Sequence, residues 1–200
     1  MTRMIDLGPA ARRMSDLLAA VPDDRLTAPT PCEKYILGDL IDHVGGLSIG
    51  LAAAARKDLG PLTSGGPAGD ATRLGADWRT RIPEDLAALA EAWRDPEAWQ
   101  GMTQAGGVEL PGDVIGCVTL DELVVHGWDV ARSIDRPYDC EDWEIDACLR
   151  FVSAAATADT MAAANGPFGP IVEVPADASP LGCLLGLTGR DPFWQPPTLR

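Results

Sequence analysis

The residues best suited to chemistry lie in the stretch Leu120–Asp129, which reads LDELVVHGWD and is largely apolar. On a helix with 3.6 residues per turn, Glu122, His126 and Asp129 fall within a wedge of roughly 60°. Two carboxylates and an imidazole would then point the same way from one helix. Such a set can bind a metal ion or move a proton.

The only other histidine, His43, lies in a second apolar segment, Leu37–Leu47. If the two segments form helices that face each other, His43, Glu122 and His126 make a set of two imidazoles and one carboxylate. Three protein ligands leave coordination positions open, which is typical of catalytic metal sites. The sequence therefore predicts a divalent metal on these residues. Metal affinity should fall below the ordinary histidine pKa of ~6.5, because a protonated imidazole cannot ligate.

Simpler interpretations of the same residues stay open. Both histidines could be core residues satisfied by one hydrogen bond each, and Glu122 could pair with His126 without a metal. An ionised glutamate in an apolar helix is expensive unless it is paired or metal-bound, which favours the metal. Asp129 could orient an imidazole, contact a substrate as acid or base, or pair with an arginine such as Arg132 or Arg73.

Composition indicates one acidic domain. The 200 residues are 46% hydrophobic with a mean hydropathy near zero, which is enough for one well-packed core. Sixteen Lys and Arg against 30 Asp and Glu give a net charge of −14, so the chain should repel nucleic acid and anionic membranes. Since no secretory leader and no apolar run of ~20 residues is visible, we expect a cytoplasmic protein.

The cysteines are odd in number and contain no C-x-x-C pair; they are Cys32, Cys117, Cys140, Cys148 and Cys183. This pattern is typical of reduced thiols that act as small buried hydrophobes, not of disulfides or a thiolate zinc site. Cys117 lies about 140° round the helix from Glu122, so it should face away from the metal.

The spacing of apolar residues predicts an all-α fold. Helices are expected at 5–20, 37–59, 70–93, 113–134, 141–164 and 181–187, with Pro83 kinking or breaking the third. A flexible loop is expected at 60–69, a hairpin around Gly106–Gly107, a helix C-cap at Asn165–Pro167 and a strand at 171–174. Together these elements predict a four-helix bundle over residues 1–165, with a short hairpin and a C-terminal extension, 166–200, packed on it.

Three segments carry a family resemblance: GDLIDHV at 38–44, LDELVVHGWDVA at 120–131, and an ending with VPADA at 174–178 and LTGRDP at 187–192. Together they resemble the DinB-like metal-binding proteins, in the actinobacterial branch related to mycothiol-dependent maleylpyruvate isomerase. The resemblance implies a DinB-like bundle with a divalent metal, usually zinc. His43, Glu122 and His126 match its ligand positions, and Asp129 matches an aspartate that belongs to the site in isomerase-like members.

The resemblance also implies a low-molecular-weight thiol such as mycothiol as cofactor. The first hypothesis is therefore a zinc-dependent, thiol-using isomerase or transferase of a small molecule, in which Asp129 steers the thiol or shuttles a proton. The alternatives are a metal-dependent hydrolase and a non-catalytic metal-binding module. The isomerases carry a sizeable C-terminal domain, whereas 35 residues follow Asn165 here, so maleylpyruvate itself is not the expected substrate. An exposed face of the alanine-rich helices could support a homodimer.

Overall fold

The computed structural model describes residues 4–66, 68–155 and 169–197, and these are mostly helical, as predicted. The helices are α1 (Gly8–Ala19), α2 (Leu37–Ala55), α3 (Pro61–Ser64), α4 (Trp78–Ala92), α5 (Gly112–Ser133), α6 (Asp142–Ala155) and α8 (Pro180–Leu187). The strands are β1 (Met102–Ala105) and β2 (Val108–Pro111), and short 3₁₀ turns cover Asp23–Arg25, Ala71–Arg73 and Pro96–Trp99.

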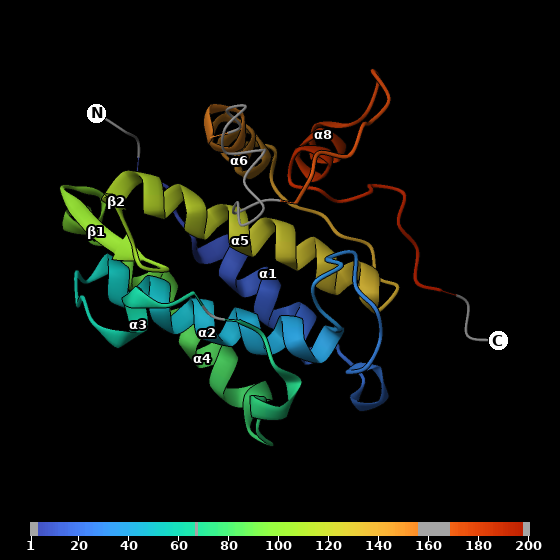
Figure 1. The fold of residues 1–200 in the computed structure, drawn as a ribbon, viewed down its shortest axis with the longest axis horizontal. Coiled ribbons are helices and arrows are strands. Elements are labelled where there is room, and N and C mark those ends of the chain that lie inside the picture. Colours follow the sequence, from blue (N-terminus) through green and yellow to red (C-terminus); the bar gives the residue numbers. More distant parts are fainter. Residues whose placement is uncertain (1–3, 67, 156–168, 198–200) are drawn as a thin grey trace.

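Four helices form the bundle: α1 packs on α4 and α5, and α2 packs on the same two helices (Figure 1). α6 lies against α5 outside this bundle, and α8 packs on α6. α5 therefore has helices on both sides. This explains why its apolar residues surround the whole helix, and why its polar side chains are held inside the protein. The predicted bundle is confirmed, whereas the predicted boundary between residues 165 and 166 lies outside the described residues.

The predicted hairpin is confirmed at Gly106–Gly107. β1 and β2 are antiparallel, and Thr103 is opposite Leu110. Both glycines have positive φ, +58° and +78°, which a two-residue hairpin turn of this hand requires and which glycine adopts without strain. The Thr103 hydroxyl donates to the Ala54 carbonyl at 2.6 Å, which fixes the hairpin to the end of α2.

Three local predictions were wrong. α2 ends at Ala55 and not near residue 59, because Lys57 takes a left-handed conformation with φ +56°. The expected loop at 60–69 contains α3. Asp70 caps the 3₁₀ turn Ala71–Arg73, so the next helix begins only at Trp78 and continues through Pro83 without a break.

The C-terminal predictions had mixed outcomes. The helix predicted at 181–187 is confirmed as α8, and the Ser179 hydroxyl caps it by accepting from the Gly182 N–H. The strand predicted at 171–174 is wrong: these described residues form no strand, and the Val172 N–H donates to the Gly186 carbonyl of α8. The predicted C-cap at Asn165–Pro167 lies outside the described residues.

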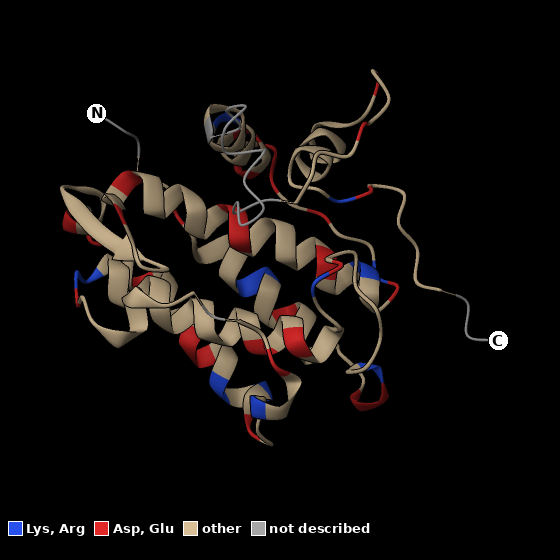
Figure 2. Ribbon diagram, in the orientation of Figure 1, with Lys and Arg blue, Asp and Glu red and all other residues tan. Residues whose placement is uncertain are grey.

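Acidic residues are spread over helices and loops alike, with fewer basic ones between them (Figure 2). This agrees with the net charge of −14. Among the described helices, none combines the length and the apolar character that a membrane span requires.

Gly116 of α5 provides a test of the packing. A Cβ there would lie 2.4 Å from Cζ3 of Trp99, whose Nε1–H donates to the Trp93 carbonyl at 2.7 Å. We predict that Gly116→Ala lowers the free energy of unfolding by about 1–3 kcal/mol through overpacking, although alanine is the better helix former. Urea unfolding measures it. Gly65→Ala, where a Cβ would meet no atom within 4 Å, is the control and should change little. A Gly116→Ala variant as stable as the wild type would show that Trp99 can move aside.

Candidate metal centre

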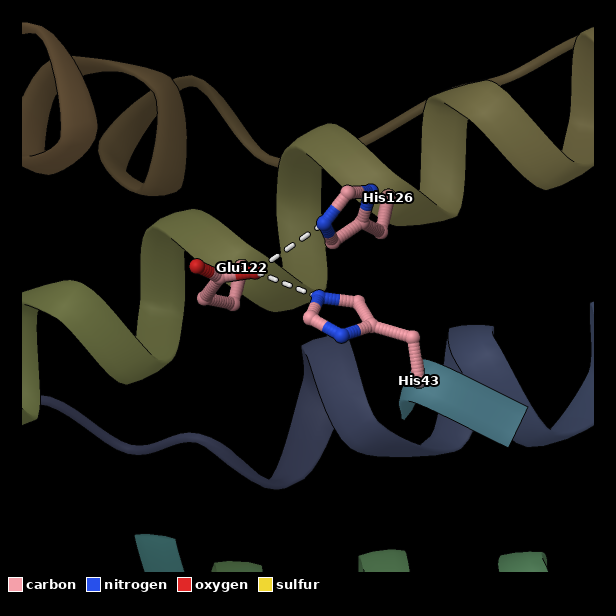
Figure 3. Close-up of side chains that lie close together, drawn as sticks. All are labelled: His43, Glu122 and His126. Atoms are coloured by element: carbon pink, nitrogen blue, oxygen red, sulfur yellow. Dashed lines mark ion pairs between the residues drawn. The ribbon is translucent and has the colours of Figure 1, made fainter. Parts of the chain in front are cut away.

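Two bundle helices bring the three predicted ligands together. His43 comes from α2, and Glu122 and His126 come from α5, one turn apart on the same face (Figure 3). One ligand atom from each residue lies within 4.8 Å of the other two. Glu122 Oε2 is 3.0 Å from His126 Nε2 and 3.8 Å from His43 Nε2. The two imidazoles meet edge to face, with ring centroids 5.0 Å apart.

The carboxylate of Glu122 has the character of a metal ligand. Its side chain is 27% exposed, yet Oε2 is buried and accepts no hydrogen bond from the residues that the structure describes. The close approach to His126 Nε2 therefore lacks hydrogen-bond geometry. Once His126 is deprotonated, as a ligand must be, a buried carboxylate oxygen without such a partner is costly. A divalent cation between the three atoms would satisfy this oxygen, so the donor set fits one.

Behind His126 lies a second layer of polar contacts. His126 Nδ1 and Asp129 Oδ2 are 2.9 Å apart, and Asp129 is completely buried. A proton on Nδ1 would be donated to this carboxylate, which leaves Nε2 facing Glu122 and His43. Asp129 Oδ2 also accepts from Arg190 Nη2 at 3.0 Å. The arginine beside Asp129 is thus Arg190, and neither Arg132 nor Arg73, which the sequence suggested.

The charges of the site stabilise one another. Burial lowers the pKa of His126, but Asp129 and Glu122 outweigh this effect and raise it to about 9. Burial raises the pKa of Glu122, yet the two imidazoles bring it below its ordinary value. The pKa of Asp129 is lowered as well, because Arg190 and His126 outweigh burial. A pKa of about 9 places a proton on His126 at neutral pH when no cation occupies the site, so the ring would then be an imidazolium between two carboxylates.

The segment before α2 contributes a wall of the site that sequence reasoning missed. The Tyr35 ring packs against the His43 ring, with centroids 5.0 Å apart and planes tilted by 34°. This segment is fixed because the Thr30 hydroxyl donates to the carbonyls of Cys32 and Tyr35, and the Leu37 N–H donates to the Ala28 carbonyl. The prolines of the segment predicted only an irregular connection.

The loop that follows residue 67 is held against α2 beside His43. The Asp70 N–H donates to Asp42 Oδ2 at 3.0 Å, and the Ala71 N–H donates to Asp39 Oδ1 at 2.8 Å. Arg73 Nη2 donates to the same Asp42 oxygen at 2.8 Å. Two carboxylates of α2 thus position this loop and lie outside the ligand set.

The cysteines are free thiols, as predicted, but the expected burial is confirmed only for Cys32 and Cys148; the other three are partly exposed. Cys117 lines a cavity of about 660 Å³ with Trp143 and Phe151 of α6 and with Met4, away from the three metal-ligand candidates as the helix geometry predicted. Burial raises the pKa of Cys117, which disfavours a reactive thiolate.

Comparison with known proteins supports the fold. Two uncharacterized proteins of Mycobacterium tuberculosis, from strains CDC 1551 / Oshkosh and ATCC 25618 / H37Rv, are each 28% identical over 176 residues, which is 87% of this chain and 90% of theirs. The crystal structure of the mycothiol-dependent maleylpyruvate isomerase matches with a TM-score of 0.54 at 20% identity, and that of its histidine-to-alanine mutant with 0.51 at 19%.

Each structural match covers 72% of this chain but 64% of the isomerase chain, so the chain spans slightly less than two thirds of that enzyme. The model of the mycothiol maleylpyruvate isomerase N-terminal domain matches residues 7–131, a range that includes α2 and all but the last two residues of α5. That range is more than half of the sequence and confirms the resemblance seen in its motifs. The chain therefore belongs to the mycothiol maleylpyruvate isomerase N-terminal domain family.

Proposed function

We propose that this protein is a zinc-dependent enzyme that uses a low-molecular-weight thiol, mycothiol, to isomerise or conjugate a small electrophile. One observation carries the proposal: His43, Glu122 and His126 direct their ligand atoms at one another, and the buried Oε2 of Glu122 accepts no hydrogen bond from the described residues. Family membership supports the thiol, since the solved isomerase of similar fold is mycothiol-dependent.

The chemistry of the donor set favours zinc. Two imidazole nitrogens and one carboxylate oxygen are typical zinc ligands, and three protein ligands leave a position for an exogenous group. When bound, zinc would lower the pKa of a coordinated thiol and present it as a thiolate nucleophile. The bundle contributes position, because α2 and α5 carry the ligands on rigid helices.

The chain's own residues have distinct parts in this proposal. His126 would ligate through Nε2, while its Nδ1–H is donated to Asp129. Asp129 has no exposed surface and contacts both His126 and Arg190, which favours orientation of the imidazole over proton transfer to a substrate. Tyr35 covers one side of the His43 ring and restricts how a ligand can approach it.

The reaction we propose is reversible addition of the thiol to an activated alkene. The thiolate forms a carbon–sulfur bond, and the electron pair of the carbon–carbon double bond moves to the activating group, so the bond becomes single and can rotate. Return of this electron pair restores the double bond, breaks the carbon–sulfur bond and releases the thiolate. Retention of the adduct and its protonation would give conjugation instead. The substrate is left as a class, a small electrophile, because the chain spans 64% of the solved isomerase.

The first prediction of this proposal concerns metal content. The purified protein should contain about one zinc per chain by elemental analysis, and His43→Ala and Glu122→Ala should lose it because each removes a ligand. Cys117→Ala removes a potential zinc ligand from the same helix, but one that lines a separate cavity, and should keep the metal. If the wild-type protein contains no metal and takes up no divalent ion, the three residues are a core hydrogen-bond network and the metal proposal is wrong.

The second prediction separates a thiol-using enzyme from a hydrolase. Cobalt(II) in place of zinc should develop sulfur-to-metal charge-transfer absorption when mycothiol is added, because thiolate enters the open position. S-methyl mycothiol, which keeps the sugar part but cannot form a thiolate, is the control and should not produce the band. A spectrum that mycothiol leaves unchanged would favour a metal-bound water, and hence the hydrolase.

The third prediction is a pH dependence. Because the pKa of His126 is raised to about 9, its proton stabilises the metal-free fold fully below the unfolded value of ~6.5, and this stabilisation is lost as pH rises through about 9. Zinc must displace that proton. Zinc affinity should therefore fall as pH drops below about 9. The ordinary histidine pKa implied a fall only below ~6.5.

Calorimetry at pH 7.5 in buffers of different ionisation enthalpy measures the displaced proton. We expect about one proton released from His126 per zinc bound, and less in Asp129→Asn, because an amide raises the pKa of the imidazole less than a carboxylate does. Zinc binding without proton release at pH 7.5 would contradict the proposed state of His126.

A further inference from the structure

We propose that Arg190 is a positioning residue of the metal centre, so that the C-terminal extension completes the site built by the bundle. The contact it makes joins residues 61 positions apart, Arg190 and Asp129. This inference deepens the proposed function and rests on it only for the metal, since the contacts among Arg190, Asp129 and His126 are made by residues of this chain alone.

The guanidinium of Arg190 is buried and held by hydrogen bonds next to the site. Nη2 donates to Asp129 Oδ2 at 3.0 Å, and Nε lies 3.5 Å from Asp129 Oδ1, so the two groups face each other as a fork. Nη1 donates to the Thr188 carbonyl at 2.7 Å. Only 9% of Arg190 is exposed, and Asp129 is fully buried. The Asp129 oxygen that Arg190 contacts is the same one that contacts His126 Nδ1.

The backbone turn after α8 determines where the Arg190 side chain lies. Gly189 has φ +81°, and a Cβ there would lie 2.8 Å from the Cα of Gly169, so glycine provides both the turn and the close approach. The Arg190 N–H donates to the Leu185 carbonyl at 2.8 Å, which fixes the residue directly after the turn. The geometry of the extension therefore aims Arg190 at α5.

Arg190 is not needed merely to attach the C-terminal extension to α5. Arg132 of α5 also holds this segment, through its Nη2 donating to the Trp194 carbonyl at 2.8 Å, and it does so without any contact to Asp129 recorded among the described residues. A buried guanidinium must be paired, and an unpaired buried carboxylate is as costly. Arg190 thus holds the Asp129 carboxylate in place while that carboxylate contacts the His126 ring.

The consequence for a metal is geometric. An imidazole ligates well only when its nitrogen lone pair points at the ion, and the partner on the other ring nitrogen sets that direction. Residues that orient ligands in this way typically affect metal affinity by about 10- to 100-fold. Arg190 sits one contact further from the metal than Asp129 and would act by holding Asp129 still.

The chain has two histidines, so the NMR signals of their rings can be assigned with one variant. With ¹⁵N-labelled histidine, NMR of the metal-free protein shows two rings, and His43→Gln assigns them. In the wild type, the Nδ1–H proton of His126 should exchange slowly with water because Asp129 holds it. Arg190→Met should broaden or remove this resonance and weaken zinc binding by about tenfold or more. Arg132→Met, which loosens the same segment without touching Asp129, should preserve both.

Arg190→Lys covers the case in which Arg190→Met fails to fold. Lysine keeps the charge but cannot form the two-pronged contact, so the fold should survive while the His126 resonance broadens and zinc affinity falls. Unchanged resonance and unchanged zinc affinity in a folded Arg190 variant would overturn the proposal, as would equal losses in Arg132→Met. The two proposals can fail separately. If the His126 resonance depends on Arg190 but the wild-type protein binds no zinc, the positioning role is supported and the metal-dependent function is overturned.

Discussion

Ionised side chains on a helix buried from both sides must find partners within the protein, and this constraint determines how α5 is built. Asp121 and Asp129 lie on this helix and are both buried. Asp121 Oδ1 has no hydrogen-bond partner among the described residues, and burial raises its pKa to about 8. Asp129 has Arg190 and His126 beside it, and its pKa is lowered. The same residue type on one helix is therefore neutral or charged according to its neighbours.

The bundle and the extension have different tasks under this constraint. α2 and α5 bring the three ligand candidates within reach, and they belong to the part matched by the family model. The contact that keeps Asp129 charged comes from beyond α8, outside that match. The fold positions the ligand candidates through helix packing, whereas the orientation of His126 would, as we propose, also depend on a segment added to the bundle. A core built from helices alone would leave Asp129 with His126 but without the guanidinium.

The ligand candidates were predictable because their signal is local. Glu122 and His126 are four residues apart on one helix, and His43 needed only the assumption that two apolar helices face each other. The hairpin turn was equally local, since Gly106–Gly107 specifies its own backbone geometry. Helix ends were predicted less well: α2 stops early because a left-handed Lys57 ends it, and apolar spacing carries no information on such a turn.

The rest of the site could not be predicted because it depends on tertiary contacts. Arg190 reaches Asp129 across 61 positions, and no periodicity connects the two. Arg132 and Arg73 were equally plausible partners by sequence, but they contact the Trp194 carbonyl and Asp42. Tyr35 lies in a proline-rich connection, where the pattern predicts irregular backbone and not which side chain covers His43.

Charge balance connects these contacts to the chemistry of the site. In the metal-free protein the carboxylates of Glu122 and Asp129 are balanced by Arg190 and by the proton on His126, whose pKa of about 9 keeps it in place at neutral pH. Exchange of that proton for a divalent cation would leave one additional positive charge in a site with little solvent to screen it. An anionic exogenous ligand would restore the balance, whereas a neutral one would not. A thiolate meets this requirement, and because Arg190 already neutralises Asp129, the additional charge would be left for the ligand to compensate.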